Sequence, residues 1–110
     1  RLFPWGNDWD CQRCNTSVKP CNSNGTTPVT HYEGKNESPF GVVDMSGNVM
    51  EWCLTNYDTK SNEINLDADS RILNGGSWFN SSNSAFNIHQ TDSGSPYVRN
   101  TIVGFRICRS

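Results

Sequence analysis

Apolar residues occur along this chain of 110 residues in short clusters separated by long polar stretches. Clusters of this length, rich in β-branched and aromatic residues, predict short strands. The predicted strands are 40–43, 49–54, 71–73 and 102–108. A turn is predicted at Ser46-Gly47-Asn48, between the first two strands.

The remaining stretches, chiefly 1–30, 56–70 and 79–101, show neither the period of a strand nor that of a helix. They are rich in Asn, Ser, Thr, Gly and Asp, which are typical of loops. We therefore expect one loop-rich domain over residues 1–110, built on short antiparallel strands.

The composition restricts the classes of function. Only 34% of the residues are hydrophobic, so we expect a bound metal, a disulfide or a further segment of chain to add stability. The net charge is −2 and no basic stripe is visible, which excludes a nucleic-acid partner. No apolar run approaches the roughly 18 residues of a membrane span. The chain opens at Arg1 rather than at a Met, and we expect a segment of a longer chain to precede it.

The chain has five cysteines, so at most two disulfides can form within it. They are Cys11, Cys14, Cys21, Cys53 and Cys108. We expect a disulfide between Cys21 and one of its two neighbours in the same loop. A zinc site made by these three thiols with His31 is the alternative. The last two cysteines are left open, as buried thiols or as a bridge between strands.

Six short motifs follow one another in an order that resembles one protein family. They are Phe3-Pro4-Trp5-Gly6-Asn7, Thr27-Pro28-Val29, Ser38-Pro39-Phe40-Gly41, the run from Asp44 to Cys53, Gly75-Gly76-Ser77-Trp78 and Gly104-Phe105-Arg106. The family is that of the formylglycine-generating enzyme, or sulfatase-modifying factor. The resemblance implies an α+β, loop-rich fold of C-type-lectin type, of which this chain would be the C-terminal part. We expect Trp5, Trp52 and Trp78 to lie in its core.

The resemblance also implies a structural calcium ion. The family's ligands would fall on the side chains of Asp44 and Glu51 and on the backbone carbonyls of Gly47 and Val49. Calcium is a hard cation that takes six to eight oxygen ligands, so this donor set is chemically suitable. In the alternative interpretation, Asp44 caps the turn and Glu51 pairs with an arginine. A second family ion site, near Asn15 and Thr16, is not expected because the local sequence departs from the family pattern.

The enzyme of this family binds copper with two cysteines shortly after the Gly-Gly-Ser-aromatic motif. The corresponding positions of this chain hold Asn80 and Ala85, and no cysteine lies between Cys53 and Cys108. Thiolates are the soft ligands that copper needs. We therefore expect no copper and no oxygen-using catalysis. The alternative is a formylglycine-generating-type oxidoreductase or another diverged enzyme of the family.

The tract 79–103 departs most from the family, because Asn83 and Asn87 stand where arginines are usual. Most residue types in it can be reached from an Asn codon by changing adenines, and Gly104-Phe105-Arg106 follows it. It thereby resembles the variable tract of proteins diversified by retroelements, which implies a ligand-binding surface on loops. The expected contact residues are Phe79, Asn80, Ser82, Phe86, His89, Tyr97, Arg99 and Asn100. Of these, Phe79 and Phe86 are also candidates for the core.

The sequence thus predicts a non-catalytic binding module whose ligand is a protein or a glycan on another cell or particle. An extracellular or surface-displayed location is the favoured hypothesis, although no motif specifies it. A polar loop without a binding role, in a diverged member of the family, is the alternative for the tract 79–103.

Overall fold

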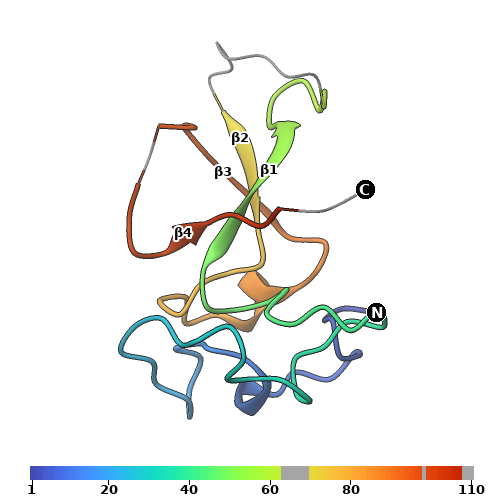
Figure 1. Ribbon diagram of the computed structural model, residues 1–110, viewed down its shortest axis with the longest axis vertical. Coiled ribbons are helices and arrows are strands. Elements are labelled where there is room, and N and C mark those ends of the chain that lie inside the picture. Colours follow the sequence, from blue (N-terminus) through green and yellow to red (C-terminus); the bar gives the residue numbers. More distant parts are fainter. Residues whose placement is uncertain (63–69, 98, 108–110) are drawn as a thin grey trace.

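The computed structural model describes residues 1–62, 70–97 and 99–107. They form two regions, one above the other in Figure 1. The loop region comprises residues 1–49 and 75–90 and fills the lower half of that view. The sheet region comprises the other described residues, and its strands cross in the upper half.

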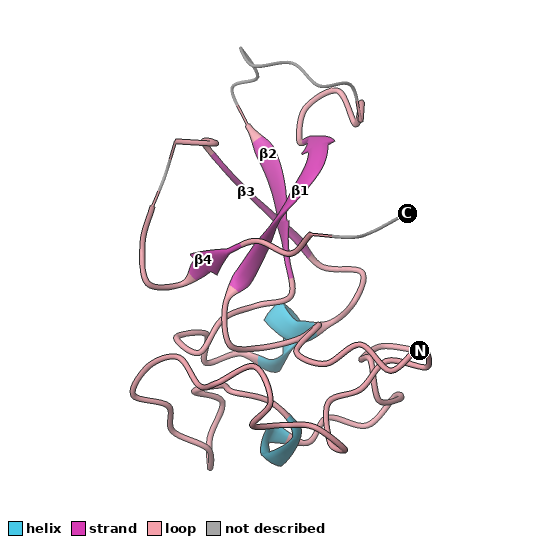
Figure 2. Ribbon diagram, viewed as in Figure 1, coloured by secondary structure: helices cyan, strands magenta, loops and turns pink. Residues whose placement is uncertain are grey.

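The sheet is mixed and has the strand order β3-β2-β1-β4 (Figure 2). Its strands are β1 (Met50–Asn56), β2 (Arg71–Asn74), β3 (Thr91–Gly94) and β4 (Val103–Gly104). The first three pair antiparallel in chain order, which agrees with the expected antiparallel pairing for β1 and β2, whereas β4 runs parallel to β1. A parallel neighbour requires a long connection, and here residues 57–102 supply it by way of β2 and β3.

The predicted strands 49–54 and 71–73 are confirmed as β1 and β2. The predicted strand 40–43 is wrong: its only ladder contact is a single bridge between Val43 and Glu37. Gly41, at φ 77°, lies in the left-handed region, which turns the chain before a strand can form. Of the predicted terminal strand only β4 is present, and Cys108 lies outside the described residues.

Strand β3 lies inside the tract that the sequence predicted to be loop. Its residues, Thr91-Asp92-Ser93-Gly94, have no apolar face and are mostly exposed. What makes it a strand is its position at the edge of the sheet, where it pairs with β2 from Arg71↔Gly94 to Asn74↔Thr91. Such pairing is a tertiary contact, and polarity alone gave no sign of it.

Helical structure in the described residues is limited to two short 3-10 turns, η1 (Cys11–Arg13) and η2 (Asn83–Phe86). Asp10 caps η1, since its carboxylate accepts a hydrogen bond of 2.9 Å from the backbone N–H of Gln12. The scarcity of helix among the described residues agrees with the absence of a helical period in the sequence.

The core of the loop region is a small cluster of Phe3, Cys14 and Phe86. Around it pack four partly buried residues: Trp5, Trp9, Val18 and Ala85. The ring of Phe3 stacks on that of Trp5 at 5.5 Å, and Trp9 contacts Phe86 at 5.1 Å. Large aromatic rings therefore fill the interior of a region that has almost no regular structure.

Trp5, Trp52 and Trp78, which were expected in the core, are each half-buried, and none is fully enclosed. Trp5 borders the aromatic cluster, as does Trp9, which the sequence analysis did not single out. Trp78 donates a hydrogen bond of 3.0 Å from Nε1 to the carbonyl of Thr101. It thereby ties the loop region to the segment before β4.

Cys11 and Cys21 form a disulfide. The prediction of a bridge that includes Cys21 is confirmed. Two of the three thiols of the zinc alternative are thereby consumed, so that alternative is wrong. Cys14 and Cys53 are free, the first buried and the second half-buried. Within the described residues, no helix is long and apolar enough to cross a membrane.

Candidate functional site

The turn between Asp44 and Asn48 is the centre of the site predicted from the sequence. Asp44, Gly47 and Asn48 have φ values of 59°, 87° and 69°, all in the left-handed region. Asp, Asn and Gly are the residues that tolerate this conformation best. A side chain at position 47 would place its Cβ 2.8 Å from the carbonyl oxygen of Asn15, so only glycine fits.

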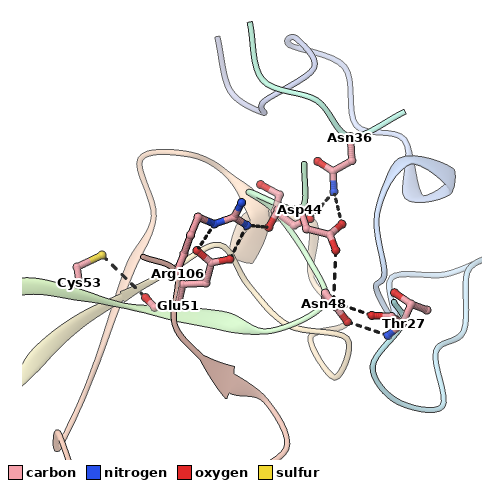
Figure 3. A network of polar contacts seen from close by, with 8 residues as sticks. Thr27, Asn36, Asp44, Asn48, Glu51, Cys53 and Arg106 are labelled. Atoms are coloured by element: carbon pink, nitrogen blue, oxygen red, sulfur yellow. Dashed lines mark hydrogen bonds and ion pairs between the residues drawn. The ribbon is translucent and has the colours of Figure 1, made fainter. Parts of the chain in front are cut away.

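Asn48 holds this turn against the N-terminal loop, as Figure 3 shows. Its Oδ1 accepts hydrogen bonds from the N–H of Thr27 and from the side chain of Asn15, at 2.9 and 3.1 Å. Its Nδ2 donates to the carbonyl of Thr27 and to Asp44 Oδ2, at 3.1 and 3.3 Å. Its backbone also bonds Asn15 and Trp78. One side chain therefore fixes three separate segments.

Asp44 is a buried carboxylate, with 5% of its surface exposed. Burial raises its pKa above the ordinary value, although hydrogen bonding from Asn48 and the charge of Arg106 oppose the shift. The amide of Asn36, fully buried, donates to Asp44 Oδ1 and to the carbonyl of Ser46, at 3.5 and 2.7 Å. The negative charge of Asp44 is thus incompletely compensated by its neighbours.

Glu51 leaves the start of β1 and meets Arg106, two residues beyond β4 (Figure 3). Arg106 Nη2 lies 2.7 Å from Glu51 Oε1, and Nε lies 3.0 Å from Oε2, which makes a bidentate pair. Arg106 Nη2 also donates to the carbonyl of Asp44 at 3.2 Å. The pair with Glu51 raises the pKa of Arg106, so the guanidinium stays charged.

All four predicted calcium donors line one cavity of about 400 Å³, together with Arg106. They are Asp44, Gly47, Val49 and Glu51. Two of them carry carboxylates and the other two were predicted to ligate through backbone carbonyls, and both are oxygen donors of the kind that a hard cation takes. The buried charge of Asp44 favours a cation there, whereas Arg106 already shares both oxygens of Glu51. The donor set therefore fits calcium, in competition with the arginine of the alternative interpretation. Among the described residues, no group of three or more His, Cys, Asp or Glu side chains is placed to hold a metal ion, so a cation at this site would depend on backbone oxygens or water for its further ligands.

The positions that correspond to the copper ligands line a small cavity of about 120 Å³. Asn80 Oδ1 accepts hydrogen bonds from the N–H and hydroxyl of Ser77, at 2.7 and 2.9 Å. Ala85 offers only a methyl group. The described residues that line this cavity include no cysteine. The buried thiol of Cys14 lies in the core instead, and burial raises its pKa to about 12, which keeps it protonated.

The predicted contact residues of the tract 79–103 divide into two groups. Six are exposed: Phe79, Ser82, His89, Tyr97, Arg99 and Asn100. Phe79 is 67% exposed and Tyr97 80%, which is unusual for large aromatic rings. Phe86, in contrast, has 0% exposure and belongs to the core, so its prediction as a contact is wrong. Asn80 is half-buried, and its Oδ1 accepts both hydrogen bonds of Ser77, so this oxygen serves the loop.

Several contacts fix the exposed part of the tract to the rest of the molecule. The N–H of Ile88 donates to the carbonyl of Leu2 at 2.8 Å, and Trp78 bonds Thr101 as described above. Phe86, in η2, fills the core from the same segment. The exposed side chains are therefore mounted on loops whose backbone is held at several points.

Sequence reasoning missed the roles of Asn36 and Asn48. The only sequence signal for Asn48 was its place after Gly47 in a turn, which indicates a left-handed residue but not its four side-chain bonds. Asn36 had no signal at all, because its bonds to Asp44 and Ser46 join loops that the sequence leaves unpaired.

Comparison with known proteins identifies the family to which this chain is similar. The chain matches the model of the sulfatase-modifying factor enzyme 1-like domain over residues 1–110. It is 27% identical over 95 residues to the inactive C-alpha-formylglycine-generating enzyme 2 of Bos taurus. That alignment covers 79% of this chain and 29% of the bovine protein. The chain is 33% identical over 86 residues to the serine/threonine-protein kinase pkn1 of Chlamydia caviae. That alignment covers 69% of this chain and 13% of the kinase. The chain thus spans less than a third of either relative.

Solved structures give similar matches. The crystal structure of CarF matches with a TM-score of 0.67 at 27% identity, and the match covers 91% of this chain and 34% of the CarF chain. Variable protein 1 of Treponema denticola has a TM-score of 0.64 at 25% identity, covering 84% of this chain and 34% of its own. PvdO of Pseudomonas aeruginosa matches with a TM-score of 0.70 at 22% identity, and the match covers 94% of this chain and 41% of the PvdO chain. This match shows a likeness of fold alone.

Proposed function

The chain belongs to the sulfatase-modifying factor enzyme 1-like domain family, and on that premise we propose that it is a non-catalytic ligand-binding module. Its loop-rich mixed sheet is the C-type-lectin-like fold that the sequence predicted. The proposed contact surface is the exposed part of the tract 79–103, and the proposed ligand is a protein or a glycan.

The exposure of aromatic side chains on anchored loops is the observation that carries this proposal. Phe79 and Tyr97 present most of their surface to solvent, while Phe86 between them is fully buried. Burying an exposed ring against a partner is favourable, and a backbone held in place loses little entropy on binding. The likeness to a Treponema denticola variable protein and to an inactive member of the family supports the same reading.

The positions of the copper ligands support the absence of the family's catalysis. An amide engaged by Ser77 and a methyl group stand at those positions, and neither binds copper as a thiolate does. A diverged enzyme of another kind would need reactive groups elsewhere. The free thiol in the core, that of Cys14, is kept protonated by burial.

The binding surface can be tested by changing the exposed residues together. A variant carrying Phe79→Ser, His89→Ser, Tyr97→Ser and Arg99→Ser should keep the melting temperature of the parent within a few degrees, because exposed substitutions cost about 0.5 kcal/mol or less each. On arrays of glycans and of cell-surface proteins, the parent should bind a defined set of spots and the variant should lose them. Equal array patterns for both proteins would refute the proposed surface.

The absence of catalysis has its own assay. A cysteine-containing sulfatase peptide, incubated with the protein, copper and oxygen, should be recovered unchanged and without oxygen consumption. Conversion of the cysteine to formylglycine would overturn the proposal and favour the diverged enzyme.

We propose further that calcium stabilises the turn from Asp44 to Glu51 without contacting the ligand. Asp44, Gly47, Val49 and Glu51 would hold the ion, which would supply positive charge to the buried carboxylate. Calcium should raise the melting temperature of the parent, and chelation should reverse the change. An Asp44→Asn variant should show no calcium-dependent shift, whereas Glu33→Gln, at the rim of the same cavity, should keep it. If calcium does not change the melting temperature of the parent, the calcium site is refuted and Arg106 is the cation that pairs with Glu51.

A further inference from the structure

A second cavity, of about 590 Å³, opens in the loop region between η1 and the loop that follows Cys21. We call it the amide cavity. Most of the side chains that line it carry an amide or a hydroxyl, among them Gln12, Asn15, Asn24, Thr26 and Thr27. No residue of the tract 79–103 and none of the four calcium donors lines it. It is therefore separate from both sites already described.

The walls of the amide cavity are held in place before any ligand arrives. The disulfide between Cys11 and Cys21 closes one side. On the other side, the buried side chain of Asn15 donates to the carbonyl of Gly25 at 2.8 Å. The backbone of Thr27 is bonded twice by the side chain of Asn48. A ligand that enters thus orders few additional groups, which favours affinity.

The lining chemistry indicates which ligand would fit. Amides and hydroxyls can both donate and accept hydrogen bonds, as can the neighbouring hydroxyls of a sugar ring. The lining includes no carboxylate and a single ammonium group, that of Lys35. The rings of His31 and Tyr32 pack edge to face at 4.7 Å, and both residues line the cavity, so the Tyr32 ring contributes aromatic surface to it.

From this cavity we propose that the chain carries a second binding site, for a single sugar residue with adjacent free hydroxyls. Anions with several charges would meet only one ammonium group, and an apolar ligand would strip water from many polar groups without replacing their hydrogen bonds. A sugar meets neither objection. Its hydroxyls would bond the side chains of Asn24 and Thr26, while its less polar face would lie against Tyr32.

The test uses the whole chain and five probes, the methyl glycosides of glucose, galactose, mannose, N-acetylglucosamine and glucuronic acid. Each is titrated while the amide resonances of the protein are followed by NMR. At least one should bind saturably, with a dissociation constant of about 1 mM or lower, and should shift resonances of residues 22–32. Failure of all five to shift them would overturn the proposal.

The decisive variant is Asn24→Leu combined with Thr26→Val, two exposed side chains whose replacements keep a similar shape and lose the polar groups. It should weaken sugar binding by roughly tenfold or more while the melting temperature is retained. A matched control, Phe79→Ser with Tyr97→Ser, should bind the sugar as the parent does. Sugar binding that survives the first variant, or that is lost in the second, would refute the amide cavity as the site. Because the control alters only the tract 79–103, failure of one site is distinguishable from failure of the other.

Discussion

In the loop region the buried side chains are largely polar, whereas in the sheet region they are aliphatic. Every buried polar side chain among the described residues lies in the loop region, including Asn15, Asn36 and Asn48. The buried residues of the sheet region are Ile72 and Leu73, both in β2. Several large apolar residues of the sheet region are exposed, among them Leu54, Phe105 and Ile107.

The contrast follows from how each region satisfies its backbone. Strands bond one another's backbone groups, so the side chains of the sheet are free to be apolar. Loops have no such ladder, and their buried N–H and C=O groups need side-chain partners. Asn48 bonds both backbone groups of Thr27, and Asn36 bonds the carbonyl of Ser46. The irregular backbone of the loop region is therefore held in part by side-chain amides.

The largest effect should come from emptying the core of the loop region. Phe86→Ala removes a ring with no exposed surface and should lower the free energy of unfolding by about 3–5 kcal/mol. Phe79→Ala, only seven positions earlier, removes an exposed ring and should change it by about 0.5 kcal/mol or less. Urea unfolding of both variants measures the difference. Similar losses would mean that the tract has no division between core and surface.

Removing the amide of Asn48 should have the next largest effect. Asn48→Ala leaves both partly buried backbone groups of Thr27 without their partner, and a fully buried group of this kind would cost about 1–3 kcal/mol. The exposed Asn22 is the matched control, and Asn22→Ala should change the free energy of unfolding by about 0.5 kcal/mol or less. If the two alanine variants unfold at the same urea concentration, amide bonding does not hold the loop region together.

The disulfide should contribute somewhat less. Its partners are 10 positions apart, and closing so short a loop in the unfolded chain corresponds to about 2–3 kcal/mol. Replacing Cys11 and Cys21 by serine should lower the melting temperature accordingly and should increase hydrogen exchange in the loop region before the sheet region. Faster exchange in β1 and β2 alone would show that the two regions do not differ in this way.

The smallest effect should be a dependence on pH. Burial raises the pKa of Asp44 in the folded protein, so the folded state binds a proton more tightly than the unfolded chain. Without calcium, the stability of the parent relative to Asp44→Asn should therefore rise as the pH falls through the pKa of Asp44, and level off below 3.8. With calcium bound, the trend should reverse, because the ion favours the carboxylate. Parallel pH profiles for the two proteins would contradict an uncompensated charge at Asp44.

The sequence by itself determined the family, the strands β1 and β2, the turn at Gly47 and the lack of thiolates at the copper positions. These depend on local features, namely short motifs, strand-forming residues and the identities of Asn80 and Ala85. The resemblance to the family, carried by the motif from Asp44 to Cys53, also implied Asp44, Gly47, Val49 and Glu51 as one candidate site.

Tertiary structure decided everything that joins distant segments. Only it separated the buried Phe86 from the exposed Phe79, made a strand of the polar β3 and paired Cys11 with Cys21. It also joined Arg106 to Glu51, 55 positions away. The physical reason is that a polar or aromatic side chain in a loop has no period to reveal its direction. Its burial is set by the partners that it meets, and those lie far along the chain.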